Sequence, residues 1–282
     1  MHWKYFDPLF EYEKWKLEID DYSGWVGHKY FIYDFLRNLK PRVIVELGTH
    51  YGTSFFSMCQ AVKDGKLKSS LYAVDLWQGD KHAGYYDKSV LSEVEKIASR
   101  YYKSLKYELL QKSFDEALGL FPVNSIDLLH IDGLHTYKAV KRDYLEWESR
   151  VKKDGLIILH DIFETKDDFG VYKLWKEIKR KHKTLEFHHS HGLGIIFKKP
   201  EKFIDFLELE EVWQRYYSTI FENKVLNKNK LLDGEIKELI EVHKENKDLK
   251  DKKEIILKDI ESLNKILSNI ENAKFYKLWH LI

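Results

Sequence analysis

The sequence predicts an α/β fold with a doubly wound, mostly parallel sheet. Short runs of β-branched and apolar residues alternate along the chain with segments of helical periodicity, and glycine or polar residues follow several of these runs directly. Strands of a parallel sheet are buried on both faces, so they read as continuous apolar runs. Regular alternation of such runs with helices is typical of a parallel sheet covered by helices on both faces.

The elements follow in order after an aromatic-rich N-terminal helical cap at 1–40, whose helix presents Phe31, Phe35 and Leu39 on one face before Pro41. The expected strands of the main domain, 41–200, are Val43–Leu47, Leu71–Val74, Tyr107–Leu110, Ile126–Ile131, Leu156–Leu159, Leu185–His189 and Leu193–Phe197. The expected helices begin at Thr53 and then cover Val90–Tyr102, Tyr137–Val151 and Tyr172–Lys181. The last two strands form a hairpin, so we expect a seven-stranded sheet with an antiparallel last strand.

The third region, 201–282, is a helical extension with a sustained heptad pattern of apolar residues. This pattern predicts a coiled coil over about 235–274, in which Asn246 and Lys253 weaken the apolar seam but can fix register and oligomeric state. A single amphipathic helix lying on its own domain is the alternative. The short aromatic end, 275–282, suits a packing cap, a partner-docking tip or an interfacial membrane anchor.

The overall composition excludes several classes of protein. The net charge of +1 on 282 residues gives no general footprint for nucleic acid. The single cysteine, Cys59, excludes an intrachain disulfide framework and fits a reducing compartment. No run approaches the ~20 apolar residues that span a bilayer, and the N-terminus lacks a signal-peptide pattern. We therefore expect a cytoplasmic protein, which its C-terminal end could hold at a membrane surface.

The most specific motif is a strand that ends in Glu46-x-Gly48-x-x-x-Gly52 and opens into a helix. This pattern is typical of a nucleotide-cofactor loop, because Gly48 lets the backbone turn off the strand and Gly52 lets the helix approach a ligand. Asp75, at the end of the next strand, suits the hydroxyls of a ribose. A carboxylate at Glu46, where a dinucleotide fingerprint has glycine, favours a cofactor with a cationic amino-acid end, such as S-adenosylmethionine. An ordinary turn is the alternative.

Ionisable residues follow the next two strands of the predicted sheet. Asp132 and His135 come after one strand, and His160 and Asp161 come at the end of the other. Because ligands bind at the carboxyl ends of such strands, we expect these groups to converge. We predict Asp132, His160 and Asp161 as ligands of Mg²⁺ or Mn²⁺, and Asp132 and His135 as catalytic residues, with His135 as general base. Taken singly, an aspartate here could instead cap a helix or occupy a turn, and His160 could be a hydrogen-bonded residue at the rim of the sheet.

Further polar and aromatic residues extend this predicted site. Trp77 follows the ribose acid and could stack on adenine, and the segment after it reads as a glycine-hinged flap, with a solvated loop as the alternative. The predicted substrate residues in this flap are Asp80, His82 and Tyr86. The predicted cofactor residues are Glu46, Gly48, Thr49, Tyr51, Gly52, Asp75, Trp77, Ser113 and Phe114.

These motifs together resemble the class I S-adenosylmethionine-dependent methyltransferases, and more narrowly methyltransferase family 24. The resemblance runs from Trp25–Phe31 through the motifs above to His191–Gly194, about two thirds of the chain. It implies a Rossmann-like fold and methyl transfer from S-adenosylmethionine. The wider neighbourhood includes metal-dependent sugar O-methyltransferases, which hold the metal with an Asp after the fourth strand and an acidic pair after the fifth. Here the pair reads His160-Asp161, so His160 could serve as base instead.

We therefore predict a metal-assisted O-methyltransferase that acts on a sugar hydroxyl of a surface glycan or polysaccharide, oligomeric through its coiled coil. One alternative is a metal-dependent hydroxylase similar to the cephalosporin hydroxylases, in which His135, His160 and one aspartate would hold the metal. The other is a non-catalytic coiled-coil scaffold whose globular head binds S-adenosylmethionine.

Overall fold

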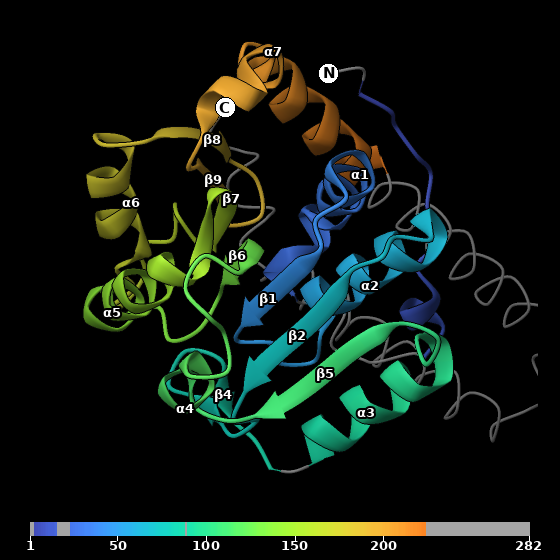
Figure 1. The fold of residues 1–282 in the computed structure, drawn as a ribbon. Coiled ribbons are helices and arrows are strands. Elements are labelled where there is room, and N and C mark those ends of the chain that lie inside the picture. The colour runs from blue at the N-terminus through green and yellow to red at the C-terminus, as the bar shows by residue number, and fades with distance from the viewer. Residues whose placement is uncertain (1–2, 16–22, 88, 224–282) are drawn as a thin grey trace, which may run out of the picture. The chain divides into compact units, whose positions relative to one another are not determined.

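A seven-stranded sheet with the order β5-β2-β1-β6-β7-β9-β8 forms the centre of the fold (Figure 1). The computed structural model describes residues 3–15, 23–87 and 89–223. The predicted coiled coil, over about 235–274, and the aromatic end at 275–282 lie outside these residues. The strands are β1 Val43–Leu47, β2 Ser70–Asp75, β5 Lys106–Gln111, β6 Ile126–Ile131, β7 Val151–His160, β8 Lys183–Phe187 and β9 Leu193–Phe197.

The strand directions confirm the prediction of a mostly parallel sheet. Strands β5, β2, β1, β6 and β7 pair in parallel. Strand β9, the last in the chain, runs antiparallel to both of its neighbours, β7 and β8. The expected hairpin at the end of the sheet is therefore present, and its second strand is inserted beside β7 rather than added at the edge.

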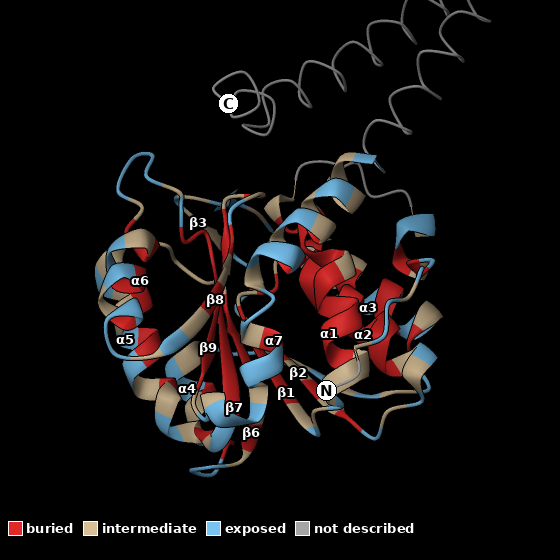
Figure 2. Cartoon of the chain, turned by 90° about the horizontal axis from the view of Figure 1, so that it is seen from above, coloured by how far each residue is buried: buried red, intermediate tan, exposed pale blue. Residues whose placement is uncertain are grey.

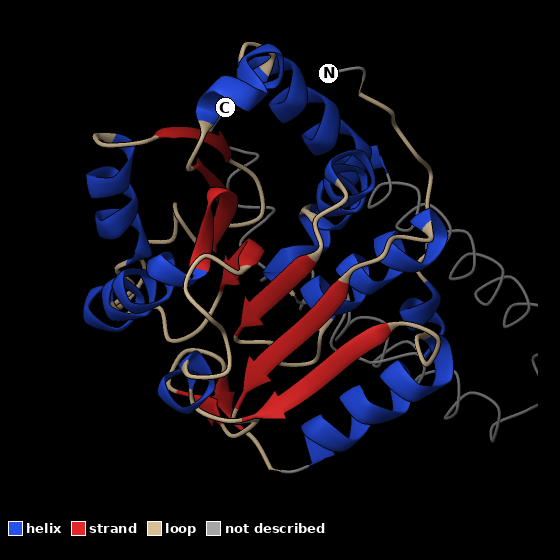
Figure 3. Ribbon diagram, viewed as in Figure 1, coloured by secondary structure: helices blue, strands red, loops and turns tan. Residues whose placement is uncertain are grey.

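Helices cover both faces of the sheet, with α1, α2 and α3 on one side and α4, α5 and α6 on the other (Figures 1 and 3). The helices are α1 Lys29–Leu39, α2 Thr53–Gly65, α3 Ser89–Tyr101, α4 Phe114–Leu118, α5 Tyr137–Trp147, α6 Val171–Lys179 and α7 Ile204–Leu207. The short helix α4 and a two-stranded hairpin, β3 Gly79–Asp80 with β4 Gly84–Tyr85, are absent from the sequence prediction. The helix expected to reach Val151 ends at Trp147, because Val151 begins β7.

The core lies between the sheet and its helices, as the buried residues in Figure 2 show. On the α5 and α6 side, Trp147 and Trp175 are fully or nearly fully buried within one cluster of apolar residues. Trp175 packs flat against β9, where a Cβ at Gly194 would lie 2.5 Å from the indole ring. Among the described residues, no helix combines the length and the apolar character needed to cross a membrane.

The buried carboxylate of Asp34, on α1, connects the N-terminal residues with the helical residues 210–217. Asp34 accepts hydrogen bonds from the backbone N–H of Phe6 at 3.1 Å and from the hydroxyl of Tyr217 at 2.8 Å. Burial raises the pKa of Asp34 to about 7, although both hydrogen bonds and Arg37 act to lower it. One side chain therefore joins three segments that are distant in the sequence.

This buried carboxyl predicts a pH dependence of stability. The pKa of Asp34 is about 7 in the folded chain and about 4 in an unfolded one. The folded state therefore binds the proton more tightly, and the stabilisation is present below about pH 4 and is lost as the pH rises through about 7. Asp34→Asn should reduce the fall in the free energy of unfolding between these two pH values, as measured by urea denaturation. The exposed control Asp167→Asn should keep the wild-type slope, and an Asp34→Asn variant with that slope would contradict the prediction.

Candidate active site

The loop after β1 is pressed against the end of β6. Gly48 has φ +87, a region that L-residues with side chains rarely adopt, and a Cβ there would lie 2.1 Å from the carbonyl oxygen of Asp132. The backbone N–H of Asp132 donates to the Leu47 carbonyl at 2.8 Å, and that of Gly48 donates to the Val74 carbonyl at 2.9 Å. The carboxyl ends of β1, β2 and β6 are thus joined by backbone contacts that leave no room for a side chain.

The two acids of the predicted cofactor motif hold this loop in place. Asp75 Oδ2 accepts from the backbone N–H groups of Thr49 at 2.8 Å and His50 at 2.9 Å, and Oδ1 accepts from Trp77 N–H at 2.6 Å. The fully buried Glu46 accepts from the Thr49 hydroxyl at 2.9 Å. Its other oxygen lies 2.9 Å from Nδ1 of His130, the residue directly opposite on β6. Asp75 is only half-buried, and Oδ1 keeps a lone pair that can accept a ribose hydroxyl.

Of the other predicted cofactor residues, Tyr51, Gly52 and Trp77 belong to this loop or contact it, whereas Ser113 and Phe114 follow β5. Trp77 is 1% exposed and donates its indole N–H to the His50 carbonyl at 2.9 Å, so in this conformation it supports the loop rather than offering a ring face. Ser113 caps α4 in a reciprocal bond with Glu116, and Phe114 packs on the core. The remaining residues are Gly52, which begins α2 with φ +88, and Tyr51, whose ring centroid lies 6.3 Å from that of Tyr86.

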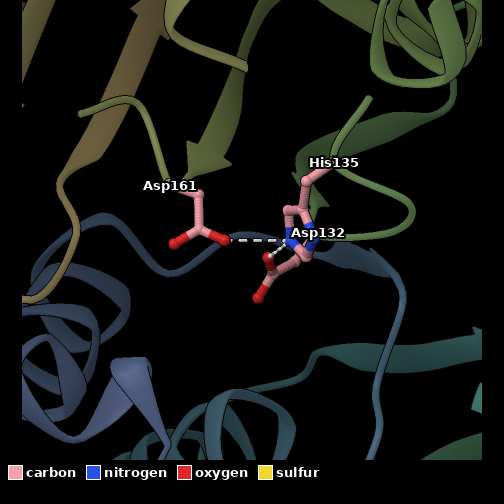
Figure 4. A group of neighbouring side chains, drawn as sticks. All are labelled: Asp132, His135 and Asp161. Atoms are coloured by element: carbon pink, nitrogen blue, oxygen red, sulfur yellow. Dashed lines mark hydrogen bonds and ion pairs between the residues drawn. The ribbon is translucent and has the colours of Figure 1, made fainter. Parts of the chain in front are cut away.

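Asp132, His135 and Asp161 converge at the ends of β6 and β7 (Figure 4). His135 Nε2 lies 3.1 Å from Asp132 Oδ1 and 3.0 Å from Asp161 Oδ2. One ligand atom from each of the three residues lies within 4.8 Å of the others. Asp161 directly follows β7 and has φ +59. This is a left-handed conformation that aspartate tolerates better than most residues. The structure thus brings together two carboxylates and one imidazole.

His160, a predicted ligand, lies behind these carboxylates. Its Nδ1 is 3.5 Å from Asp132 Oδ1 and 3.3 Å from Asp161 Oδ1, whereas its Nε2 is 3.0 Å from the Ser190 carbonyl oxygen and donates to it. The ring is therefore held on both sides by the protein. In the main prediction from the sequence, His135 is a general base and not a metal ligand. The turn at residues 132–136 brings its imidazole next to the two carboxylates, where it could also bind a metal.

Opposite charges shift the protonation equilibria of this cluster. Burial acts to raise the pKa of Asp132, but His160 and His135 outweigh it and hold that pKa well below its ordinary value. For His135, burial acts to lower the pKa, and Asp132 and Asp161 together raise it above the ordinary value. The same balance raises the pKa of His160 to about 9. The carboxylates and imidazoles thus stabilise each other's charged forms.

The predicted substrate flap reaches the cluster through an aromatic stack. The ring of His82 lies 4.3 Å from that of Phe169, which stacks on His135 at 4.9 Å and 9°. His82 Nε2 also lies 2.6 Å from an oxygen of Asp168, which pairs with Lys81 as well. The other two predicted substrate residues are Asp80, whose carboxylate accepts from the backbone of His82 and Ala83, and Tyr86, whose ring lies 5.2 Å from that of His50.

Two residues of this region were not predicted from the sequence. Phe169 covers His135, and Trp25 donates its indole N–H to Asp132 Oδ2 at 2.9 Å. Trp25 lies within the stretch that carries the family resemblance, which was the only signal for it. Phe169 had no comparable signal, because its position depends on the loop after β7.

Comparison with known families shows which proteins this region is similar to. Residues 45–162 match the family model of methyltransferase family 24, described as a methyltransferase domain. This part of the chain is therefore similar to the methyltransferase domains of family 24. The matched range contains Glu46, Gly48, Asp75 and all three residues of the converging cluster. The predicted resemblance is therefore confirmed for the part of the chain that holds the site.

Individual relatives are more distant or only partly matched. The uncharacterized protein y4gI of Sinorhizobium fredii is 40% identical over 178 residues, which are 63% of this chain and 19% of that protein. The chain therefore spans about a fifth of the length of this relative. The S-adenosylhomocysteine-bound methyltransferase PaMTH1 of Podospora anserina is 13% identical, with a TM-score of 0.46 over 60% of this chain and 77% of that chain. The O-methyltransferase TomG of Streptomyces achromogenes, solved with S-adenosylmethionine, is 11% identical, with a TM-score of 0.46. The match covers 60% of this chain and 78% of that chain.

The close approach at Gly48 predicts a sharp effect of adding one methyl group. Gly48→Ala forces a Cβ against the Asp132 carbonyl at an unfavourable φ, so we expect the free energy of unfolding to fall by roughly 1–3 kcal/mol. The matched control is Gly119→Ala, because Gly119 has φ −66 and no heavy atom within 4 Å of its Cβ position. Chemical denaturation of the two variants would measure this, and equal stabilities would contradict the steric argument.

Proposed function

We propose that this chain is an S-adenosylmethionine-dependent O-methyltransferase in which Asp132, His135 and Asp161 hold a divalent cation beside the acceptor hydroxyl. The observation that carries the proposal is the convergence of these three side chains inside the methyltransferase domain, at the carboxyl ends of β6 and β7. Gly48, the first glycine of the cofactor motif, touches the backbone of Asp132 directly, so the cofactor loop and the polar cluster share one edge of the sheet.

The residues present fit a sulfonium cofactor. Gly48 keeps the loop after β1 free of a side chain, and Asp75 retains a lone pair at the end of β2, where a ribose hydroxyl would reach it. S-adenosylmethionine supplies an electrophilic methyl group, so the protein's task is to position and activate a nucleophilic oxygen.

The polar cluster also fits a divalent cation. Two carboxylates this close repel each other unless a cation or a proton lies between them. His135 Nε2 lies between them, 3.1 and 3.0 Å from the two carboxylates. Two oxygen ligands and one imidazole suit Mg²⁺ or Mn²⁺. A cation held there lowers the pKa of a hydroxyl bound to it.

In the proposed transfer, the acceptor oxygen forms its bond to the methyl carbon as the carbon–sulfur bond breaks, and the hydroxyl proton leaves to a protein group. His135 is the candidate for that group when it is not a ligand, since its Nε2 lies at the centre of the cluster. Asp132 and Asp161 stabilise the resulting imidazolium, from 3.1 and 3.0 Å. Phe169, stacked on the imidazole, restricts the access of water to it.

The acceptor and the partners are further parts of the proposal. The resemblance to sugar O-methyltransferases supports a sugar hydroxyl of a surface glycan, with contacts at Asp80, His82 and Tyr86. The heptad pattern supports a homo-oligomer formed by 235–274, a range outside the described residues, and 275–282 is the proposed contact with a membrane or glycan-assembly partner. A cytoplasmic location, the absence of a nucleic-acid partner and the domain limits near residues 40 and 200 remain predictions.

The two alternatives predicted from the sequence receive less support. A hydroxylase of the cephalosporin type would need two histidines and one carboxylate on one metal, but the converging set of ligand atoms in the described residues holds one histidine, His135. A scaffold that binds the cofactor without turnover would not require two carboxylates and an imidazole to converge at the strand ends.

Cofactor binding is testable by calorimetric titration of the EDTA-treated full chain with S-adenosylhomocysteine. We expect binding, and we expect Asp75→Asn to weaken it about 10- to 150-fold, which corresponds to one lost charge-assisted hydrogen bond. The matched control is Asp154→Asn, because Asp154 lies near the opposite end of β7. Absence of wild-type binding would contradict the proposed function, and a variant that unfolds as well as losing affinity would limit Asp75 to its role in the loop.

Measurements of Mn²⁺ affinity would distinguish whether His135 is a metal ligand or only the general base. We expect Asp161→Asn to weaken Mn²⁺ binding at least about tenfold while leaving affinity for S-adenosylhomocysteine unchanged. His135→Gln should weaken Mn²⁺ binding to a similar extent if His135 is a ligand. If His135 is only the base, Mn²⁺ affinity should persist while methyl transfer falls about 100-fold or more. Wild-type protein that binds the cofactor but not Mn²⁺ would remove the cation from the proposal.

A further inference from the structure

The 3-10 helix Gly24–Gly27, which precedes α1, lies directly against the polar cluster. A Cβ at Gly24 would lie 2.9 Å from the His191 ring and 3.0 Å from the His160 ring. A Cβ at Gly27 would lie 1.6 Å from the hydroxyl of Ser190. The two glycines therefore allow the N-terminal segment to contact both the end of β7 and the loop before β9.

This segment carries Trp25 into the site. The indole is 3% exposed and its ring centroid lies 4.6 Å from that of His130 and 5.6 Å from that of His160. Its Nε1–H donates to Asp132 Oδ2 at 2.9 Å. An indole N–H can only donate, so this contact is formed only with an acceptor such as the carboxylate oxygen.

The bond from Trp25 completes the set of contacts around Asp132. Oδ2 is held by Trp25 at 2.9 Å, while Oδ1 lies 3.1 Å from His135 Nε2 and 3.5 Å from His160 Nδ1. Both oxygens of the carboxylate therefore have a partner on a separate element of the fold. Rotation of the carboxylate would break the contact with Trp25, and the rigid burial of the indole prevents the donor from following.

We propose that Trp25 is a positioning residue, whose indole N–H fixes the Asp132 carboxylate in the orientation that lets Asp132, His135 and Asp161 share one cation. The inference rests on the proposed function, because it concerns the same cation site. Partners that orient metal ligands from outside typically change metal affinity 10- to 100-fold when they are removed. The N-terminal segment is thus part of the site as well as part of the fold.

The test compares Mn²⁺ binding by EDTA-treated full-length wild type, Trp25→Phe and Trp175→Phe in calorimetric titrations. Phenylalanine keeps an aromatic ring against His130 and removes the N–H donor. Trp175 is a matched control, because it is 2% exposed and donates its indole N–H to a carboxylate of Glu186 at 2.8 Å. We expect Trp25→Phe to weaken Mn²⁺ binding about tenfold or more and Trp175→Phe to keep it within about twofold. Affinity for S-adenosylhomocysteine should be unchanged in both variants.

Wild-type Mn²⁺ affinity in Trp25→Phe would overturn the inference, and so would a parallel loss of Mn²⁺ and S-adenosylhomocysteine binding, which marks a general structural defect. A second measurement needs neither the metal nor a stable Trp25→Phe variant. Asp132→Asn should shift the ¹⁵N-indole signal of Trp25 in the metal-free protein and leave that of Trp175 in place. An unmoved Trp25 signal would overturn the contact itself. Wild type that shows this shift but binds no Mn²⁺ would support the contact and contradict the cation in the proposed function.

Discussion

The packing of two backbone segments at the edge of the sheet is the constraint on which the site depends. The loop after β1 meets the residue after β6 so closely that only glycine fits at Gly48. The backbone bonds from Asp132 to Leu47 and from Gly48 to Val74 set the positions of three strand ends. Because the parallel strands are buried on both sides, these ends cannot shift independently. The polar residues that follow β6 and β7 are therefore attached to backbone whose position is fixed, and the site is as rigid as the sheet.

Electrostatics then determine how these side chains arrange themselves. The side chains of Asp132 and Asp161 are only 15% and 11% exposed, and two uncompensated carboxylates in such surroundings would be costly. His135 and His160 approach both carboxylates, and the indole N–H of Trp25 adds a donor to Asp132. A second buried pair, Glu46 and His130, lies next to the same indole. The charges of the site are thus balanced within a layer that draws on β1, β6, β7 and the N-terminal segment.

Most of the sheet could be predicted because its strands are short, β-branched and punctuated by glycine or aspartate. The predicted Val43–Leu47 and Ile126–Ile131 coincide with β1 and β6, and the hairpin of the last two strands was expected as well. The helix α4 and the β3–β4 hairpin escaped prediction, because two to five residues carry too little periodicity. The choice between His135 and His160 also lay beyond the pattern, because it depends on how the loop at 132–136 turns toward the end of β7.

The sequence by itself determined the order of strands and helices along the chain, the glycines of the loop after β1, and four candidate residues at the strand ends, Asp132, His135, His160 and Asp161. It could do so because apolar periodicity and turn chemistry act over a few residues. Only the tertiary structure decided that Trp25, 107 residues away, donates to Asp132 and that Glu46 contacts His130. It also decided that Asp75 accepts a hydrogen bond from the backbone of the loop after β1. Such contacts join residues that are far apart in the sequence. They depend on how separate elements pack against each other, and no local pattern in the chain encodes that packing.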